Sequence, residues 1–255
     1  MKAVSPAAVE RGLFTLPRGR LVFCPDPTQA EGDLFERAIT GAAVAQLWHA
    51  PQSLVVPASY KRFAQLAQVS QQFADAGCPV FLRKSGGGLV PQGPGIINLS
   101  LAYPLARTLG DAAEGVYQQL CGLLIHALEN LGVTTGLQAV AGSFCDGRFN
   151  LACGKGSAAR KIAGTAQYWH AIPRQTDDGP RRHVVLAHAV LLVDCDLALA
   201  HRYANQFEAA LGSGRDYQAS KTVSVAQMLP ASETEVWNKV IDALTEHITK
   251  ERIFT

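Results

Sequence analysis

Apolar residues recur every three or four positions in five parts of the chain, which predicts five amphipathic helices. The first helix carries a capping-box pattern, Thr28 with Glu31, and the second ends in a stop signal, Gly77 followed by Pro79. Another capping sequence at 232–235 precedes the last helix. We expect the helices at about 28–45, 59–76, 111–131 and 197–211, with the last one following residue 235.

Shorter apolar runs predict strands, and hairpins cluster in the middle of the chain. Gly154, Gly156 and Ser157 supply a turn between two of these runs, and the sequence TDDGP at 176–180 supplies another. Helices and strands alternate irregularly, which favours an α/β or α+β fold with a mixed sheet flanked by helices. The predicted strands are 45–49, 53–56, 80–83, 96–101, 149–152, 161–166, 183–193 and 221–225.

The first twenty residues show no sustained periodicity and contain Pro6 and Pro17. We therefore expect an irregular N-terminal arm that packs last or not at all. No low-complexity linker divides the remaining chain. The predicted organisation is an arm over 1–27 followed by a single domain over 28–255.

Composition narrows the function classes. A chain of 255 residues that is 48% hydrophobic can bury a substantial core, and a net charge of +2 demands neither a nucleic-acid partner nor an anionic membrane. Six cysteines without CxxC pairs predict reduced thiols and no metal site. The most apolar stretch, 184–200, is interrupted by polar residues, and the N-terminus lacks an apolar leader, so we expect a cytoplasmic protein.

Cys145 and Lys161 flank the predicted hairpin and are the first candidates for chemistry. A thiol accepts an acyl group only as a thiolate, which a nearby ammonium favours, and the same ammonium can stabilise an oxyanion. The pair alone is more typical of a buried cysteine and a surface lysine without a chemical role. Cys153 is close in the sequence and remains a second candidate nucleophile.

Four segments together resemble the catalytic domain shared by lipoate-protein ligases, biotin-protein ligases and octanoyltransferases, most closely its lipoate-handling branch. They are RKSGGG at 83–88, GIINLSL at 95–101, KIAGTAQ at 161–167 and LAHAVLLVDCDL at 186–197, and the resemblance covers about residues 30–212. It implies that the loop from Ser85 to Gly88 lines the acyl pocket and that Lys161 contacts the substrate carbonyl. Matching positions imply substrate-binding roles for Arg83, Ser85, Gly86, Gly87, Gly88, Asn98, Gly164, Thr165, Ala166, Gln167 and His188.

A further segment, GSFCDGRFNL at 142–151, is similar to the nucleophile segment of amidotransferases that move octanoyl or lipoyl groups between carrier domains. This likeness places the nucleophile on Cys145 and implies transfer to a carrier lysine through an acyl-cysteine, without a cofactor or a metal. The expected partner is a lipoyl domain or a glycine-cleavage H-type carrier, with acyl carrier protein as an additional candidate donor. Leu89, Ile97 and Leu99 are expected to line a channel for the eight-carbon tail.

Two alternatives remain open. One is an ATP-dependent lipoate-protein ligase that forms a lipoyl-adenylate with ATP and Mg²⁺, in which Cys145 is incidental. Leu82 and the segment 91–94 depart from what ligases of this family often carry, which weakens adenylate binding in particular. The other is a non-catalytic homologue that binds acyl carriers, suggested by the altered segments 91–94 and 187–190.

Overall fold

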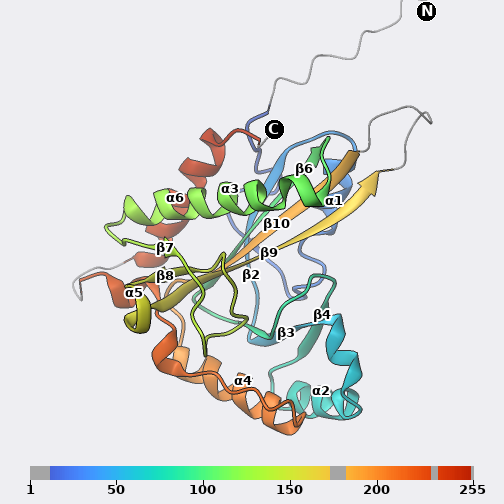
Figure 1. The fold of residues 1–255 in the computed structure, drawn as a ribbon, viewed down its shortest axis with the longest axis vertical. Helices are drawn as coiled ribbons and strands as arrows, with labels where there is room; N and C mark the ends of the chain where they lie inside the picture. Colours follow the sequence, from blue (N-terminus) through green and yellow to red (C-terminus); the bar gives the residue numbers. More distant parts are fainter. Residues whose placement is uncertain (1–11, 173–181, 231–234, 254–255) are drawn as a thin grey trace, which may run out of the picture.

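A seven-stranded mixed sheet forms the centre of the computed structural model, which describes residues 12–172, 182–230 and 235–253 (Figure 1). β1 and β2 run parallel, and the other neighbouring strands run antiparallel. In spatial order the strands are β1 (Val22–Phe23), β2 (Val44–His49), β6 (Ile96–Leu105), β10 (Arg182–Leu192), β9 (Arg160–Ile172), β8 (Leu151–Cys153) and β7 (Gly136–Leu137).

A second, three-stranded sheet lies beside the large one. Its order is β4 (Val80–Arg83), β3 (Ser53–Pro57) and β5 (Val90–Gln92), with β3 parallel to β4 and antiparallel to β5. Two helices, α2 (Leu66–Asp75) and α4 (Leu197–Ala210), pack with this small sheet around a second hydrophobic core (Figure 1).

Helices cover both faces of the large sheet, which confirms the predicted fold class. α3 (Leu109–Glu129) and α6 (Val236–Lys250) enclose the main core against one face (Figure 1). α1 (Gly32–Ile39) packs against β2, β6 and β10 on the opposite face. None of these described helices is long and apolar enough to cross a bilayer.

The alternation of side chains along β6 decides which residues face the helices. Ile97 and Leu99 point into the main core under α3 and α6, whereas Asn98 and Ser100 point to the other side of the sheet. Leu89 is buried in the second core. The expectation that Leu89, Ile97 and Leu99 line an acyl channel is therefore wrong, because each is sealed inside a core.

Several predicted elements have different bounds. The first helix begins at Gly32 and ends at Ile39, and Glu31 makes no side-chain capping bond. The second splits into a 3₁₀ turn, η1 (Ala58–Arg62), followed by α2. The strand expected at 221–225 is wrong, because this segment contains the end of η3 (Ala219–Lys221) and the start of α5 (Val225–Met228), which a capping box formed by Ser224 and Gln227 begins. A further 3₁₀ turn is η2 (Gly156–Ala158).

Two predicted signals fall outside the described residues. These are the turn at 176–180 and most of the cap at 232–235. The long strand and the last helix beside them, β10 and α6, are confirmed.

The described part of the N-terminal segment is built into the domain. Phe14 is 2% exposed in the main core and meets the ring of Tyr103 edge-on. Thr15 exchanges backbone hydrogen bonds with β2, donating to Ala43 and accepting from Ala45. The expectation that the segment does not pack is thus wrong for Phe14 and Thr15, because a buried aromatic ring and backbone hydrogen bonds join them to the domain. The order in which the segment packs stays a prediction.

We expect Phe14→Ala to lower the free energy of unfolding by about 3–5 kcal/mol, because it removes a fully buried ring and leaves a cavity. Phe23→Ala is the matched control, since Phe23 is 55% exposed. Urea denaturation of both variants measures the difference. Equal, small effects would show that Phe14 does not anchor the segment.

Candidate active site

A cavity of about 650 Å³ opens between the large sheet, α1 and the small sheet. Its volume is in the range of small-molecule sites, about 300–1,000 Å³. We call it the main cavity. Sequence-predicted residues that line it are Arg83, Ser85, Cys145, Lys161, Gly164, Thr165, Ala166, Gln167 and His188.

Cys145 lies on the loop between β7 and β8, in the left-handed backbone region with φ +45°. A residue other than glycine adopts this conformation at a cost of roughly 1–2 kcal/mol. The preceding side chain, Phe144, is buried against the rings of His201 and Tyr217, at centroid distances of 4.2 and 5.1 Å. This packing anchors the loop, while Cys145 itself stays partly exposed to the cavity.

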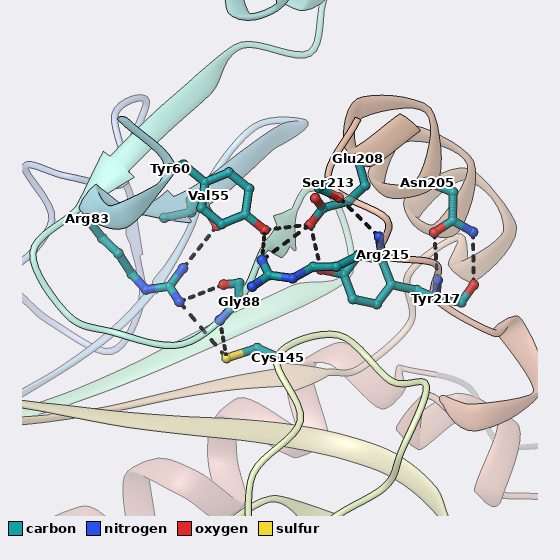
Figure 2. Close-up of polar contacts among 10 residues, drawn as sticks. All are labelled: Val55, Tyr60, Arg83, Gly88, Cys145, Asn205, Glu208, Ser213, Arg215 and Tyr217. Atoms are coloured by element: carbon teal, nitrogen blue, oxygen red, sulfur yellow. Dashed lines mark hydrogen bonds and ion pairs between the residues drawn. The ribbon is translucent and has the colours of Figure 1, made fainter. Parts of the chain in front are cut away.

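Two groups face the Cys145 sulfur, one from the loop Ser85 to Gly88, which we call the glycine loop, and one from the end of β4 (Figure 2). The backbone N–H of Gly88 donates to Sγ at 3.1 Å, and Arg83 Nη2 is 4.0 Å from it. Gly87 has φ +102°, and a Cβ there would lie 2.5 Å from Sγ. A side chain at this position would therefore displace the sulfur.

Arg83 holds the glycine loop through backbone carbonyls. Its guanidinium donates to Val55 at 3.0 Å and to Gly88 at 2.7 Å (Figure 2). It also donates to Gly86 at 2.9 Å. Burial lowers the pKa of Arg83, and the neighbouring charge of Cys145 acts in the opposite direction. Within the described parts of the chain no carboxylate forms an ion pair with this guanidinium. Its positive charge is thus available to an anion beside Gly88.

Lys161, at the start of β9, holds the backbone that carries the cysteine. It is 5% exposed, and its Nζ donates to the carbonyl oxygens of Phe144 and Cys145, the latter at 3.0 Å. Burial lowers the pKa of Lys161 from 10.5 to about 8, with the charges of Cys145 and Asp146 opposing the change. Gly164 leaves the space that the ammonium occupies, since a Cβ there would lie 2.7 Å from Nζ.

The remaining sequence-predicted residues are not all on the main cavity. Asn98 is buried and forms two hydrogen bonds with the side-chain amide of Gln92, which does line the cavity. Gly86 and Gly87 line a second, smaller cavity, described below. Gly88 reaches Cys145 through its N–H.

Comparison with known proteins now resolves the family. The family model described as Lipoyl protein ligase A/B catalytic domain matches residues 33–249. The chain belongs to this family.

Two curated relatives in the family differ in what their names record. An uncharacterised protein of Cupriavidus necator is 58% identical over 209 residues, which are 81% of this chain and 82% of the relative. An octanoyl-[GcvH]:protein N-octanoyltransferase of Kyrpidia tusciae is 34% identical over 188 residues, which are 69% of this chain. The match spans 62% of the Kyrpidia protein, less than two thirds of its length.

Solved structures share the family fold. Lipoate-protein ligase A bound with ATP matches with a TM-score of 0.61 at 17% identity, over 90% of this chain and 85% of that one. A bipartite lipoate protein ligase of Thermoplasma acidophilum, solved with its E2 lipoyl domain, matches with a TM-score of 0.57 at 17% identity, over 90% and 83%. At this identity the likeness concerns the fold alone.

A polar group that sequence reasoning missed lies at the N-cap position of α1. Glu31 Oε1 is 2.9 Å from His188 Nδ1 and accepts a hydrogen bond from Ser100 Oγ at 2.7 Å, while Trp48 Nε1 donates to the same hydroxyl. Burial raises the pKa of Glu31, but the contacts with His188 and Ser100 together lower it by more than burial raises it, so the net shift is downward. The spacing of Thr28 and Glu31 had indicated a helix cap. In this family member Glu31 instead orients His188 on the cavity wall.

A buried carboxylate braces the second core behind the cysteine loop (Figure 2). Glu208 is 0% exposed and accepts hydrogen bonds from the hydroxyls of Tyr60 and Tyr217, and Arg215 donates to Tyr60. Burial and the bond to Glu208 raise the pKa of Tyr60 to about 12. Tyr217 in turn packs on Phe144, so the cluster supports the position of the loop.

The second candidate nucleophile is enclosed. Cys153 is 3% exposed in the main core, and burial raises the pKa of its thiol. It does not line the main cavity. Of the two candidates, the structure brings only Cys145 to the glycine loop.

We expect Lys161→Met to remove a pH dependence of stability. The folded protein releases the Lys161 proton near pH 8, whereas the unfolded chain keeps it until about 10.5, so wild-type stability rises with pH in this window. The difference in unfolding free energy between wild type and variant should grow by about 1.4 kcal/mol per pH unit there. Urea denaturation at several pH values measures it. Parallel stability curves would show that Lys161 titrates normally.

Proposed function

We propose that the protein transfers an octanoyl or lipoyl group to a lysine of a lipoyl carrier protein, through a thioester on Cys145. The observation that carries this proposal is the placement of Cys145 Sγ on the main cavity, beside the N–H of Gly88 and the guanidinium of Arg83. A hydrogen-bond donor and a cation are the groups that stabilise a thiolate. The same groups can stabilise the oxyanion of an acyl-transfer intermediate.

The proposed reaction has two acyl-transfer steps: the first loads Cys145 with the acyl group, and the second passes the group on to a lysine. In the first, the Cys145 thiol gives up its proton and the thiolate attacks the acyl carbonyl, an S–C bond forms, and the bond to the donor's thiol or amine breaks as that leaving group takes the proton that the cysteine gave up. In the second, a neutral lysine amine attacks the thioester, a C–N bond forms, and the C–S bond breaks. The proton lost by the amine returns to the cysteine sulfur, so the enzyme is regenerated.

Lys161 acts in this proposal by positioning the nucleophile. Its ammonium donates hydrogen bonds to two successive carbonyl oxygens, those of Phe144 and Cys145, and thereby supports the left-handed backbone at the cysteine. The resemblance to the family implied a contact with the substrate carbonyl. Both observed bonds of the ammonium go to the loop, and its third N–H contacts the substrate carbonyl in our proposal.

The main cavity provides the surface that the acyl chain requires. Apolar side chains from both sheets line it, including Val55, Leu82, Val190 and Leu192. Each buried CH₂ group of a chain contributes about 0.8 kcal/mol. Because Cys145 lines the same cavity, a chain bound there places its carbonyl at the sulfur in our proposal.

The proposed carrier is a lipoyl domain or a glycine-cleavage H-type protein, with acyl carrier protein as a further donor. The name of the Kyrpidia relative records an octanoyl-[GcvH] donor, which supports this class of partner. We also propose a cytoplasmic location, because all six cysteines are free thiols, as is typical of a reducing compartment.

Incubation with octanoyl-carrier thioesters, followed by intact-mass measurement, tests the nucleophile. We expect one octanoyl adduct on the wild type and on Cys153→Ser, and no adduct on Cys145→Ser, because Cys153 is enclosed in the core. A carrier that accepts the group from the loaded wild type should release the adduct. An adduct that persists in Cys145→Ser would place the thioester elsewhere.

The same variants separate the transferase from a ligase. A ligase would modify the carrier with free lipoate only in the presence of ATP and Mg²⁺, and would retain this activity in Cys145→Ser. Modification without ATP that depends on Cys145 supports the transferase. No modification of any carrier under either condition would favour a binding homologue.

A further inference from the structure

A second cavity, of about 310 Å³, is also lined by Cys145. It is lined by the cysteine loop from Cys145 to Asn150, by Tyr117 on α3, and by the glycines Gly86 and Gly87. Four residues line both cavities: Cys145, Thr165, Ala166 and Gln167. The nucleophile therefore stands where the two cavities meet.

The glycine loop also lies between the two cavities. Ser85 lines the main cavity, whereas Gly86 and Gly87 line the second one. The sulfur of Cys145 rests against this rim, since a Cβ at Gly87 would lie 2.5 Å from it. An acyl carbonyl at Sγ thus has one cavity for its chain and another for the group bonded to its far side.

Two aromatic rings and a guanidinium form one wall of the second cavity. The rings of Tyr117 and Phe149 stack at 4.4 Å with planes 10° apart. The guanidinium of Arg148 covers Phe149 at 4.5 Å and is itself held by Glu114 at 3.0 Å. Because Phe149 is covered by Tyr117 and Arg148, we take Tyr117 as the aromatic contact for the methylene stem of a lysine side chain, which is apolar up to its charged end.

An anionic group lies on the same cavity. Asp146 follows the nucleophile, is exposed, and uses Oδ1 to accept a hydrogen bond from the Val140 N–H at 2.7 Å. Its charge favours the approach of a cationic chain end. A lining that combines aromatic rings with polar groups and a carboxylate next in sequence to the nucleophile suits a primary amine on a flexible alkyl arm.

We infer that the second cavity holds the lysine side chain of the carrier while the main cavity holds the acyl chain. The inference rests on the proposed thioester mechanism. The amine that leaves in the first step and the amine that attacks in the second lie on the same side of the acyl carbonyl. The donor arm and the acceptor arm therefore occupy this cavity in turn. The acyl group must stay bonded to Cys145 after the donor arm leaves and until the acceptor arm enters.

Three glycine substitutions test the assignment with matched changes. Gly147 lines the second cavity, Gly32 lines the main cavity, and Gly136 is exposed on neither. A Cβ at any of the three meets nothing within 4 Å, and none has a positive φ. Leucine at each position thus adds the same bulk in three different places without backbone strain.

The measurement separates loading from discharge. Each protein is loaded from the octanoyl thioester of 2-mercaptoethanol, and discharge of the adduct is followed by intact mass with hydroxylamine or with Nα-acetyl-lysine methylamide. We expect Gly147→Leu to slow discharge to the lysine amide about tenfold or more, because the amine is misplaced, and to leave hydroxylamine discharge unchanged. Gly32→Leu should instead weaken loading of octanoyl relative to butanoyl, and Gly136→Leu should change neither.

Three results would overturn the inference, and they are distinguishable. If the wild type carries an adduct on Cys145 and Gly147→Leu discharges to the lysine amide at the wild-type rate, the arm lies elsewhere while the proposed function stands. If Gly147→Leu slows both nucleophiles equally, the variant has disturbed the cysteine and the arm assignment is also rejected. If the wild type forms no adduct, the proposed function and this inference fail together.

Discussion

The site depends on one buried ammonium. Lys161 donates hydrogen bonds to the carbonyl oxygens of Phe144 and Cys145. These bonds hold the cysteine in the left-handed backbone conformation, which residues with a side chain rarely adopt. Burying the charge is itself costly, which is why the pKa of Lys161 falls to about 8. Two carbonyl acceptors and the open space at Gly164 are what allow it.

The glycine loop completes the site from the other layer of the fold. Arg83 belongs to the small sheet and ties the loop to β3, so that Gly88 meets the sulfur of a cysteine carried by the large sheet's connections. Phe144 makes the reverse contact, since it reaches from the cysteine loop into the core beneath the small sheet. The two layers are thus joined at the nucleophile, and the main cavity is the space left between them.

Much of the fold follows from local pattern. Helical spacing located α3 and α4 because each buries one face against a core, and a continuous apolar run located β10 because both of its faces are buried. Local pattern failed where tertiary contacts compete with it. Glu31 had the spacing of a helix cap but bonds His188 and Ser100, and Phe14 lies in a segment without periodicity but is buried by β6 and β2 nearby.

The sequence by itself determined the family motifs, the mixed sheet with its helices, and the residues Cys145, Lys161, Arg83 and the triple glycine as candidates. Only the tertiary structure decided how they meet. Cys145 and Gly88 are 57 residues apart, and no local rule specifies which sulfur faces which amide. The same holds for the apolar residues, because Ile97 and Leu99 differ from the cavity-lining Val190 and Leu192 only in the face of the sheet they occupy. That face is set by strand register and by the helices packed on it, which are properties of the folded chain.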